Sequence, residues 1–254
     1  MRFAAVVLSI AVLAVFGGIH GTAQEGPSPS NDPRIGLKAG LRDAGTASRN
    51  LELIASIPKP AGFFDPKAPA GLPTPPERAP GEEAAVDQAA REHELAGTAP
   101  PPQPGADNLN FSNSDLAFRE SRVFVGNFHG FNVYDIDRAG KPRLLASVVC
   151  PGGQGDISVY GNLLFMSVEQ TRGRIDCGTG GVAEPVSSVR LRGVRIFDIS
   201  DIRTPRQVAA VQTCRGSHTH TLVTNQADPL NVYVYGSGTG RVRSASELAD
   251  CSAL

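Results

Sequence analysis

The chain has 254 residues, and its 24 Lys and Arg side chains almost balance 25 Asp and Glu, which leaves a formal net charge of −1 at pH 7. This balance excludes the strong basic field that is typical of nucleic-acid-binding proteins and of polybasic membrane surfaces, so no nucleic-acid partner is expected. The 20 prolines and 28 glycines are many for a chain in which 41% of the residues are hydrophobic. Much of the length therefore serves as turns and linkers rather than as core.

The first 23 residues have the composition of a secretory signal. Arg2 precedes an apolar run from Phe3 to Phe16, and the small residues Gly21 and Ala23 follow this run. A membrane anchor is the alternative, but a spanning helix needs about 20 apolar residues. We therefore expect residues 1–23 to be a signal peptide that is cleaved after Ala23, with no stable membrane span afterwards. The predicted location is secreted, periplasmic or at the cell surface.

Residues 24–105 carry few signals of a packed domain. Residues 24–57 begin as a polar tail that cannot order itself, and the spaced leucines after Gly36 are compatible with a short amphipathic helix. Twelve of the 20 prolines lie between Pro58 and Pro104. Because proline fixes φ and lacks an amide donor, we expect residues 58–105 to form an extended, largely disordered linker.

Residues 106–254 consist of short β-rich runs that repeat along the chain. Asp115-Leu-Ala-Phe resembles Asp156-Ile-Ser-Val, which lies 41 residues later. Gly130-Phe-Asn-Val-Tyr-Asp resembles Gly193-Val-Arg-Ile-Phe-Asp, and each is followed by a proline at the same distance. A third copy begins at His220-Thr-Leu-Val, and about 23 extra residues lengthen the second copy between Glu169 and Arg192.

Each copy supplies four strand signals, which in the first copy cover residues 115–118, 122–127, 131–136 and 143–149. A four-stranded unit that repeats about every 40 residues is typical of a β-propeller blade. Tandem β-sandwiches are the alternative, but a unit of 41 residues is too short to form one sandwich. We predict an all-β fold, a partial β-propeller of about two and a half blades that cover residues 110–153, 154–217 and 218–254.

Two of these strand ends also resemble a known repeat. Tyr134-Asp-Ile-Asp and Ile196-Phe-Asp-Ile-Ser-Asp are similar to the LVIVD repeat of exported bacterial proteins, which is taken to form β-propellers. The segments that begin at Asp32 and Cys214 look like an uncharacterised group of such proteins. The resemblance implies the fold and no catalytic activity. Because the chain ends inside the third copy, we expect an N-terminal fragment that is poorly stable and self-associates through bare strand edges.

Polar residues recur where the first strand of each copy begins. The alignment places Asp115, Asp156 and His220 in one register and His218 in the preceding polar register. Residues two apart share a face of a strand, so both histidines, with the two aspartates, suit a zinc, copper or iron site. The competing interpretation, which we favour, is that Asp115 and Asp156 bond the turns of the next repeat without any metal. No residue is assigned a catalytic role.

All four cysteines follow the predicted signal peptide, and no C-x-x-C motif is present. In an exported chain they favour two disulfides, for which three pairings are open. The register of the repeats favours Cys150–Cys177 and Cys214–Cys251, each of which ties a loop to the entry of a blade. In the chain-entropy model each bond contributes about 3–4 kcal/mol.

The remaining motifs favour binding over catalysis. Five arginines gather in or beside the second-copy insertion, which we expect to be a solvated loop: Arg172, Arg174, Arg190, Arg192 and Arg195. Gly236-Ser-Gly-Thr-Gly lacks the Lys-Ser/Thr of a phosphate-binding loop. We predict an exported propeller-type binding or scaffold protein whose loops contact a protein or ligand. The alternative is a metal-dependent oxidase or hydrolase with the His/Asp site at the channel mouth.

Overall fold

The computed structural model describes residues 32–40, 43–68, 110–137 and 141–253. The chain divides into two units, residues 1–52 and 53–254. The predicted signal peptide, its cleavage site at Ala23 and residues 69–105 of the predicted linker lie outside the described residues. The short helix that the leucines after Gly36 allow is not formed in residues 32–40 and 43–57, which are turns and irregular chain. Leu51 and Leu53 are 80% and 69% exposed, so no packing surface stabilises a helix there.

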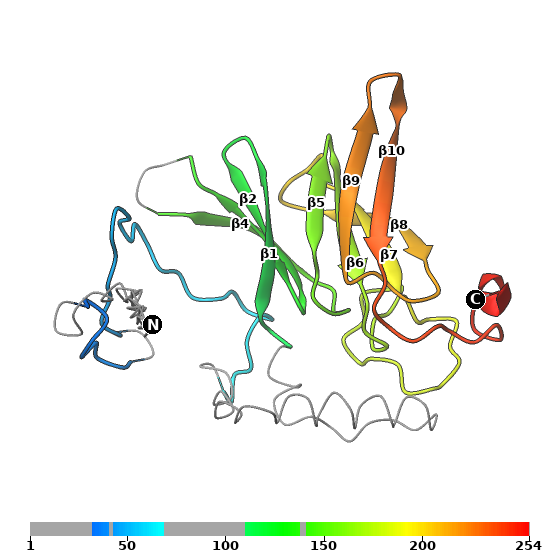
Figure 1. Cartoon of the computed structure of the whole chain (residues 1–254), viewed down its shortest axis with the longest axis horizontal. Coiled ribbons are helices and arrows are strands. Elements are labelled where there is room, and N and C mark those ends of the chain that lie inside the picture. The colour runs from blue at the N-terminus through cyan, green and yellow to red at the C-terminus, as the bar shows by residue number, and fades with distance from the viewer. Residues whose placement is uncertain (1–31, 41–42, 69–109, 138–140, 254) are drawn as a thin grey trace, which may run out of the picture. The chain divides into compact units, whose positions relative to one another are not determined.

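The described part of the second unit is all-β and contains three antiparallel sheets (Figure 1). The first sheet has the order β1-β2-β3-β4 and the second β5-β6-β7-β8, while β9 pairs with β10 in the third. The strands of the first sheet are β1 (Asn113–Arg119), β2 (Arg122–Asn127), β3 (Gly130–Asp135) and β4 (Arg143–Val149). Those of the second are β5 (Ile157–Tyr160), β6 (Leu163–Val168), β7 (Gly193–Asp198) and β8 (Arg206–Gln212). The third contains β9 (Thr219–Asn225) and β10 (Asp228–Ser237).

The third and fourth strands of the two larger sheets are built alike. The aspartates that end β3 and β7 cap the following turn: Asp135 accepts the amide of Asp137 at 3.1 Å, and Asp198 that of Ser200 at 2.9 Å. In both sheets the register shifts at the residue before this aspartate. This repetition confirms the repeats that the sequence predicts. Because β7 begins 63 residues after β3, residues of these strands are equivalent at an offset of 63.

The core lies between the first and second sheets. Phe124, Phe131 and Val133 of the first sheet are fully buried and pack with side chains of the second sheet, among them Met166 and Phe197. The rings of Phe131 and Phe197 meet edge to face, with centroids 5.1 Å apart. The third strands of the two sheets, β3 and β7, therefore contribute the aromatic centre of the interface.

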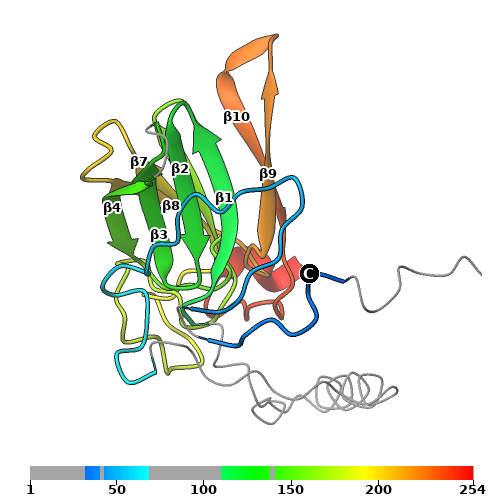
Figure 2. The ribbon, with the colours of Figure 1, turned by 90° about the vertical axis from the view of Figure 1, so that its left-hand side faces the viewer.

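The third sheet is smaller and more exposed than the other two. Figures 1 and 2 both show the β9–β10 hairpin rising beyond the ends of the neighbouring strands. On β10, Tyr235 is 65% exposed, and Leu230 near the hairpin turn is 94% exposed. Among the described residues, β10 pairs with β9 alone, so its outer edge is free.

A short segment of the predicted linker is packed against the first sheet rather than extended in solvent. Phe63 is fully buried, and its ring lies edge to face with the imidazole of His129, at a centroid distance of 6.3 Å. Phe111 contacts the same imidazole at 4.7 Å. Burial, and then the positive charge of Arg172, lower the pKa of His129 below its ordinary value. The prediction of an extended, disordered linker is therefore wrong around Phe63. Burial of this aromatic ring orders the chain there despite the neighbouring prolines.

We predict that Phe131→Ala lowers the free energy of unfolding by about 3–5 kcal/mol, because it removes a buried aromatic ring and leaves a cavity. Urea unfolding at 25 °C measures this change. The control is Phe118→Ala, since Phe118 is 63% exposed and its loss is expected to cost about 0.5 kcal/mol or less. Equal losses in the two variants would contradict the position assigned to the core.

We predict that acidification from pH 7.5 to 5.5 destabilises the protein partly through His129. The folded state binds a proton on this imidazole less readily than the unfolded chain, so the stability it supports is present above pH about 6.5 and is lost as the pH falls below that value. His129→Phe keeps a ring between Phe63 and Phe111 and removes the titration. We expect the free energy of unfolding, measured with urea at both pH values, to depend less on pH in the variant than in the wild type. An unchanged dependence would contradict the prediction.

Candidate functional site

Aspartates at the head of the inner strands tie each sheet to the next. The Asp115 carboxylate accepts the backbone amide of Ile157 at 2.9 Å, which joins the first sheet to β5. The Asp156 carboxylate accepts the amide of His220 at 2.7 Å, which joins the second sheet to β9. Each aspartate thus bonds the first strand of the following repeat, as our favoured interpretation of the sequence has it. We call these two contacts the aspartate latches.

The latches correct the predicted register of His220. If Asp115 and Asp156 are equivalent, then their amide donors Ile157 and His220 are equivalent too, and Thr219 takes the register of Asp156. A shift of one residue moves a side chain to the other face of a strand. His220 therefore occupies an inward position that Ile157 fills in the second sheet, and it is 8% exposed there.

The buried imidazole of His220 lies in a polar network between the second and third sheets. Its Nδ1 is 2.8 Å from the Asp156 carboxylate and 2.8 Å from the Ser167 hydroxyl. The hydroxyl of Ser167 lies 2.8 Å from that of Ser217. Burial opposes ionisation of Asp156, but the bonds from His220 outweigh it and hold the pKa of this carboxyl below its ordinary value. The network joins the second and third sheets by polar contacts, whereas the first and second sheets are joined by an apolar core.

His218 has a different partner from His220. Its Nδ1 is 2.5 Å from the Glu169 carboxylate, and 39% of its side chain is exposed. In residues 32–40, 43–68, 110–137 and 141–253, no three His, Cys, Asp or Glu side chains form a cluster that could hold a metal ion. The structure brings His220 against Asp156 but pairs His218 with Glu169, so the predicted set of His218, His220, Asp156 and Asp115 does not form a metal shell. One histidine joins two sheets, and the other lies beside a loop.

The insertion between β6 and β7, residues 169–192, is held by buried arginines rather than solvated. Arg190 and Arg192 are 6% and 5% exposed. Arg190 forms an ion pair with Glu247, which also accepts Arg243 Nε at 2.8 Å. Burial opposes ionisation of Glu247, but its bond from Arg243 lowers the pKa of this carboxyl. The insertion is thus tied to residues 238–253, the loop after β10, and the prediction of a solvated loop is wrong for these arginines.

Arg195 is buried within β7 and satisfies backbone carbonyls. Its guanidinium donates to the carbonyls of Cys150 at 2.9 Å, Pro151 at 3.0 Å and Arg174 at 2.8 Å. Burial lowers the pKa of Arg195 to about 10, so the side chain stays protonated at neutral pH. The sequence alone did not show this role, since an arginine between two apolar strand residues gives the same pattern as a solvent-facing position.

Both disulfides brace the same end of the sheets. The structure joins Cys150 to Cys177 and Cys214 to Cys251, the pairing that the register of the repeats favours. The first bond ties the insertion to the end of the first sheet. The second ties the loop 238–253 to the segment between β8 and β9. Together with the buried arginines, these bonds fix two long loops beside each other.

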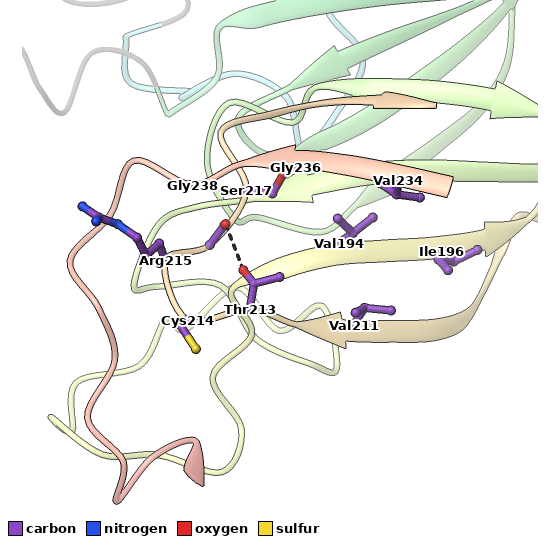
Figure 3. A pocket seen from close by; sticks show the side chains of 11 residues that line it. Val194, Ile196, Val211, Thr213, Cys214, Arg215, Ser217, Val234, Gly236 and Gly238 are labelled. Carbon is purple, nitrogen blue, oxygen red and sulfur yellow. Dashed lines mark hydrogen bonds between the residues drawn. The ribbon is translucent and has the colours of Figure 1, made fainter. Parts of the chain in front are cut away.

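An open pocket of about 500 Å³ lies between β7 and β8 on one side and β10 on the other. Figure 3 shows Val194 and Ile196 of β7, Val211 of β8 and Val234 of β10 around it, and the hydroxyl of Thr213 donates to the Gly216 carbonyl at its rim at 2.9 Å. The lining is Val194, Ile196, Val211, Thr213, Cys214, Arg215, Gly216, Ser217, Val234, Gly236 and Gly238. Arg215 is the only ionisable side chain among these residues. The pocket therefore provides apolar contact and backbone groups but no acid–base pair.

Compared with known proteins, the chain matches no family model and no curated protein sequence. Within the described residues, no helix is both long and apolar enough to cross a membrane. The resemblance to LVIVD repeats therefore rests on the residues quoted for it.

We predict that Asp156→Asn lowers the free energy of unfolding at pH 7 by about 1–3 kcal/mol, because a charge-assisted latch is replaced by a neutral one. The deficit should shrink as the pH falls below about 4, since protonation removes the same charge from the wild-type carboxyl. Urea unfolding at pH 7 and pH 3 measures both effects. The control is Asp137→Asn at an exposed site; a deficit that persists unchanged at pH 3 would contradict the latch.

Proposed function

We propose that this chain is an exported, propeller-type binding or scaffold protein that presents its braced loops to a protein or ligand. Sheets that follow one another along the chain, each latched to the next by an equivalent aspartate, support a propeller-type arrangement. The LVIVD-like strand ends are consistent with it. Two disulfides support folding in an oxidising compartment, as a signal peptide over residues 1–23 requires.

The observation that carries the proposal is the ordered insertion, residues 169–192. The equivalent connection in the first sheet is two residues long, between β2 and β3. Loops longer than about 12–15 residues with no strands or helices of their own are usually functional when they are ordered. Burying Arg190 and Glu247 to hold such a loop costs desolvation free energy that folding of the sheets does not require.

The exposed side chains of the insertion fit a binding surface. Ile175, Val186 and Val189 are 40%, 46% and 37% exposed on a backbone that the disulfides and arginines fix. A rigid backbone lowers the entropic cost of association. Apolar side chains that are surrounded by polar ones match the apolar centre and polar rim of a protein interface. The pocket offers apolar contact without an acid–base pair in its lining, which supports binding over the metal-dependent enzyme.

We predict that a photo-reactive amino acid at Val186 forms a specific crosslink in the cell envelope of the source organism. The control position is Tyr160, which is 42% exposed but lies at the β5–β6 turn, at the opposite end of the second sheet. Gel shifts and mass spectrometry measure the adducts. A discrete adduct from Val186 that is absent from Tyr160 supports the proposal; no adduct, or equal adducts from both positions, contradicts it.

A further inference from the structure

Residues 58–63, which we call the strap, are attached to the first sheet by one aromatic side chain. Phe63 is fully buried, whereas Ile57 just before the strap is 43% exposed and residues 65–67 just after it are exposed. The amide of Phe63 donates to the carbonyl of Pro60 at 3.1 Å, so the anchor lies on a tight turn of the strap itself. Because Phe63 is the one buried residue of the strap, opening the strap costs less free energy than unfolding the sheets.

The anchor packs on the imidazole of His129, in the turn between β2 and β3. The ring of Phe63 lies edge to face with this imidazole at a centroid distance of 6.3 Å, and the centroid of the Phe111 ring is 4.7 Å away. The strap also holds this second ring, since the ammonium of Lys59 donates to the carbonyl of Phe111. Departure of the strap therefore removes one ring from His129 and loosens the other.

The site beneath the strap suits a neutral imidazole better than a charged one. Nδ1 of His129 is buried and has no hydrogen-bond partner among the described residues. A neutral imidazole has one nitrogen without a proton, so Nδ1 can be that nitrogen, whereas an imidazolium carries a proton on both. The adjacent phenyl rings are weak acceptors, so a proton on Nδ1 is buried without an adequate partner, which costs free energy. The docked strap therefore favours the neutral form of His129.

The charged groups that neighbouring elements bring to this turn are cationic. Arg172 of the insertion donates to the carbonyl of Phe128 at 3.3 Å, and after burial its charge is the second cause that lowers the pKa of His129. Lys59 is the charged group of the strap, and burial lowers its pKa. Residues 110–112 before β1 and 150–153 after β4 carry no charged side chain. None of these groups offsets a positive charge on His129.

We propose that the strap is a pH-sensitive cover that leaves the first sheet as the pH falls below about 6.5, while the three sheets stay folded. Removal of Phe63 lets water solvate the protonated ring of His129, so protons shift the population toward the released strap. For each unit by which docking lowers the pKa of this imidazole, full protonation raises the ratio of released to docked strap about tenfold. Release exposes Phe63 and Phe111 near Arg172 of the insertion, and it does not depend on what the insertion binds.

A tryptophan at the anchor reports the release of the strap. The chain contains no tryptophan, so Phe63→Trp supplies a single fluorophore at this position. In the purified, disulfide-bonded chain we expect acrylamide quenching of this fluorophore to rise about twofold or more between pH 7.5 and 5.5, while circular dichroism shows intact sheets. Hydrogen exchange of residues 58–68 in the unsubstituted chain, corrected for the intrinsic effect of pH, measures the same opening without a substitution.

A matched pair of histidine variants, each combined with Phe63→Trp, tests which group controls the strap. His129→Phe keeps a ring beneath the anchor and removes the titration, so the strap is expected to stay docked at both pH values. His218→Gln removes a histidine that pairs with Glu169 instead, and the pH response is expected to persist. Quenching and exchange that do not change with pH, the same change in the His129→Phe variant, or loss of the sheet signal over the same pH range would overturn the proposal.

Discussion

The arrangement of the sheets depends on the aspartate latches. A carboxylate at the head of an inner strand accepts the first amide of the next repeat, so it fixes both the spacing and the register of neighbouring sheets. The apolar core between the first two sheets then adds most of the burial, with Phe131 and Phe197 at its centre. At the second junction the latch is reinforced by His220 and Ser167 rather than by a comparable apolar core. The polar junction supports a hairpin whose second strand, β10, pairs with β9 alone among the described residues.

The parts of the fold that follow from local pattern were predictable from the sequence. Two kinds of residue act on the chain within a few residues of their own position: the turn aspartates Asp135 and Asp198, and the prolines that precede β4 and β8. They identified the repeats, and the register of the repeats favoured the cysteine pairing. His220 was predicted in the register of Asp156, but it takes the register of Ile157, one residue later. A sequence does not show whether a histidine replaces the aspartate of a repeat or the apolar residue after it. The hydrogen bond from the His220 amide to Asp156 decides between them. Phe63 was assigned to a linker for a similar reason, since its neighbours are prolines and its burial comes from His129 and Phe111, far along the chain.

The arginines of the insertion show where reasoning from charge fails. Five basic residues in one segment predict a solvated loop, yet Arg190, Arg192 and Arg195 are almost fully buried. Their partners are backbone carbonyls and Glu247, 57 residues from Arg190. Carbonyl acceptors leave no trace in a sequence, because every residue has one. The spacing of four residues between Arg243 and Glu247 was the one sign of an ion pair in this region. The same spacing is also typical of a helix, so it did not indicate that Glu247 binds the insertion.

The same equivalence that explains the core also explains the pocket. Each interface between sheets needs an apolar floor from one repeat and a third strand from the next, and the second sheet supplies the floor through Val194, Ile196 and Val211. Gly236 and Gly238 remove the side chains that would close the space from β10. An open edge beside an apolar groove is a hazard for uncontrolled association unless a specific strand covers it.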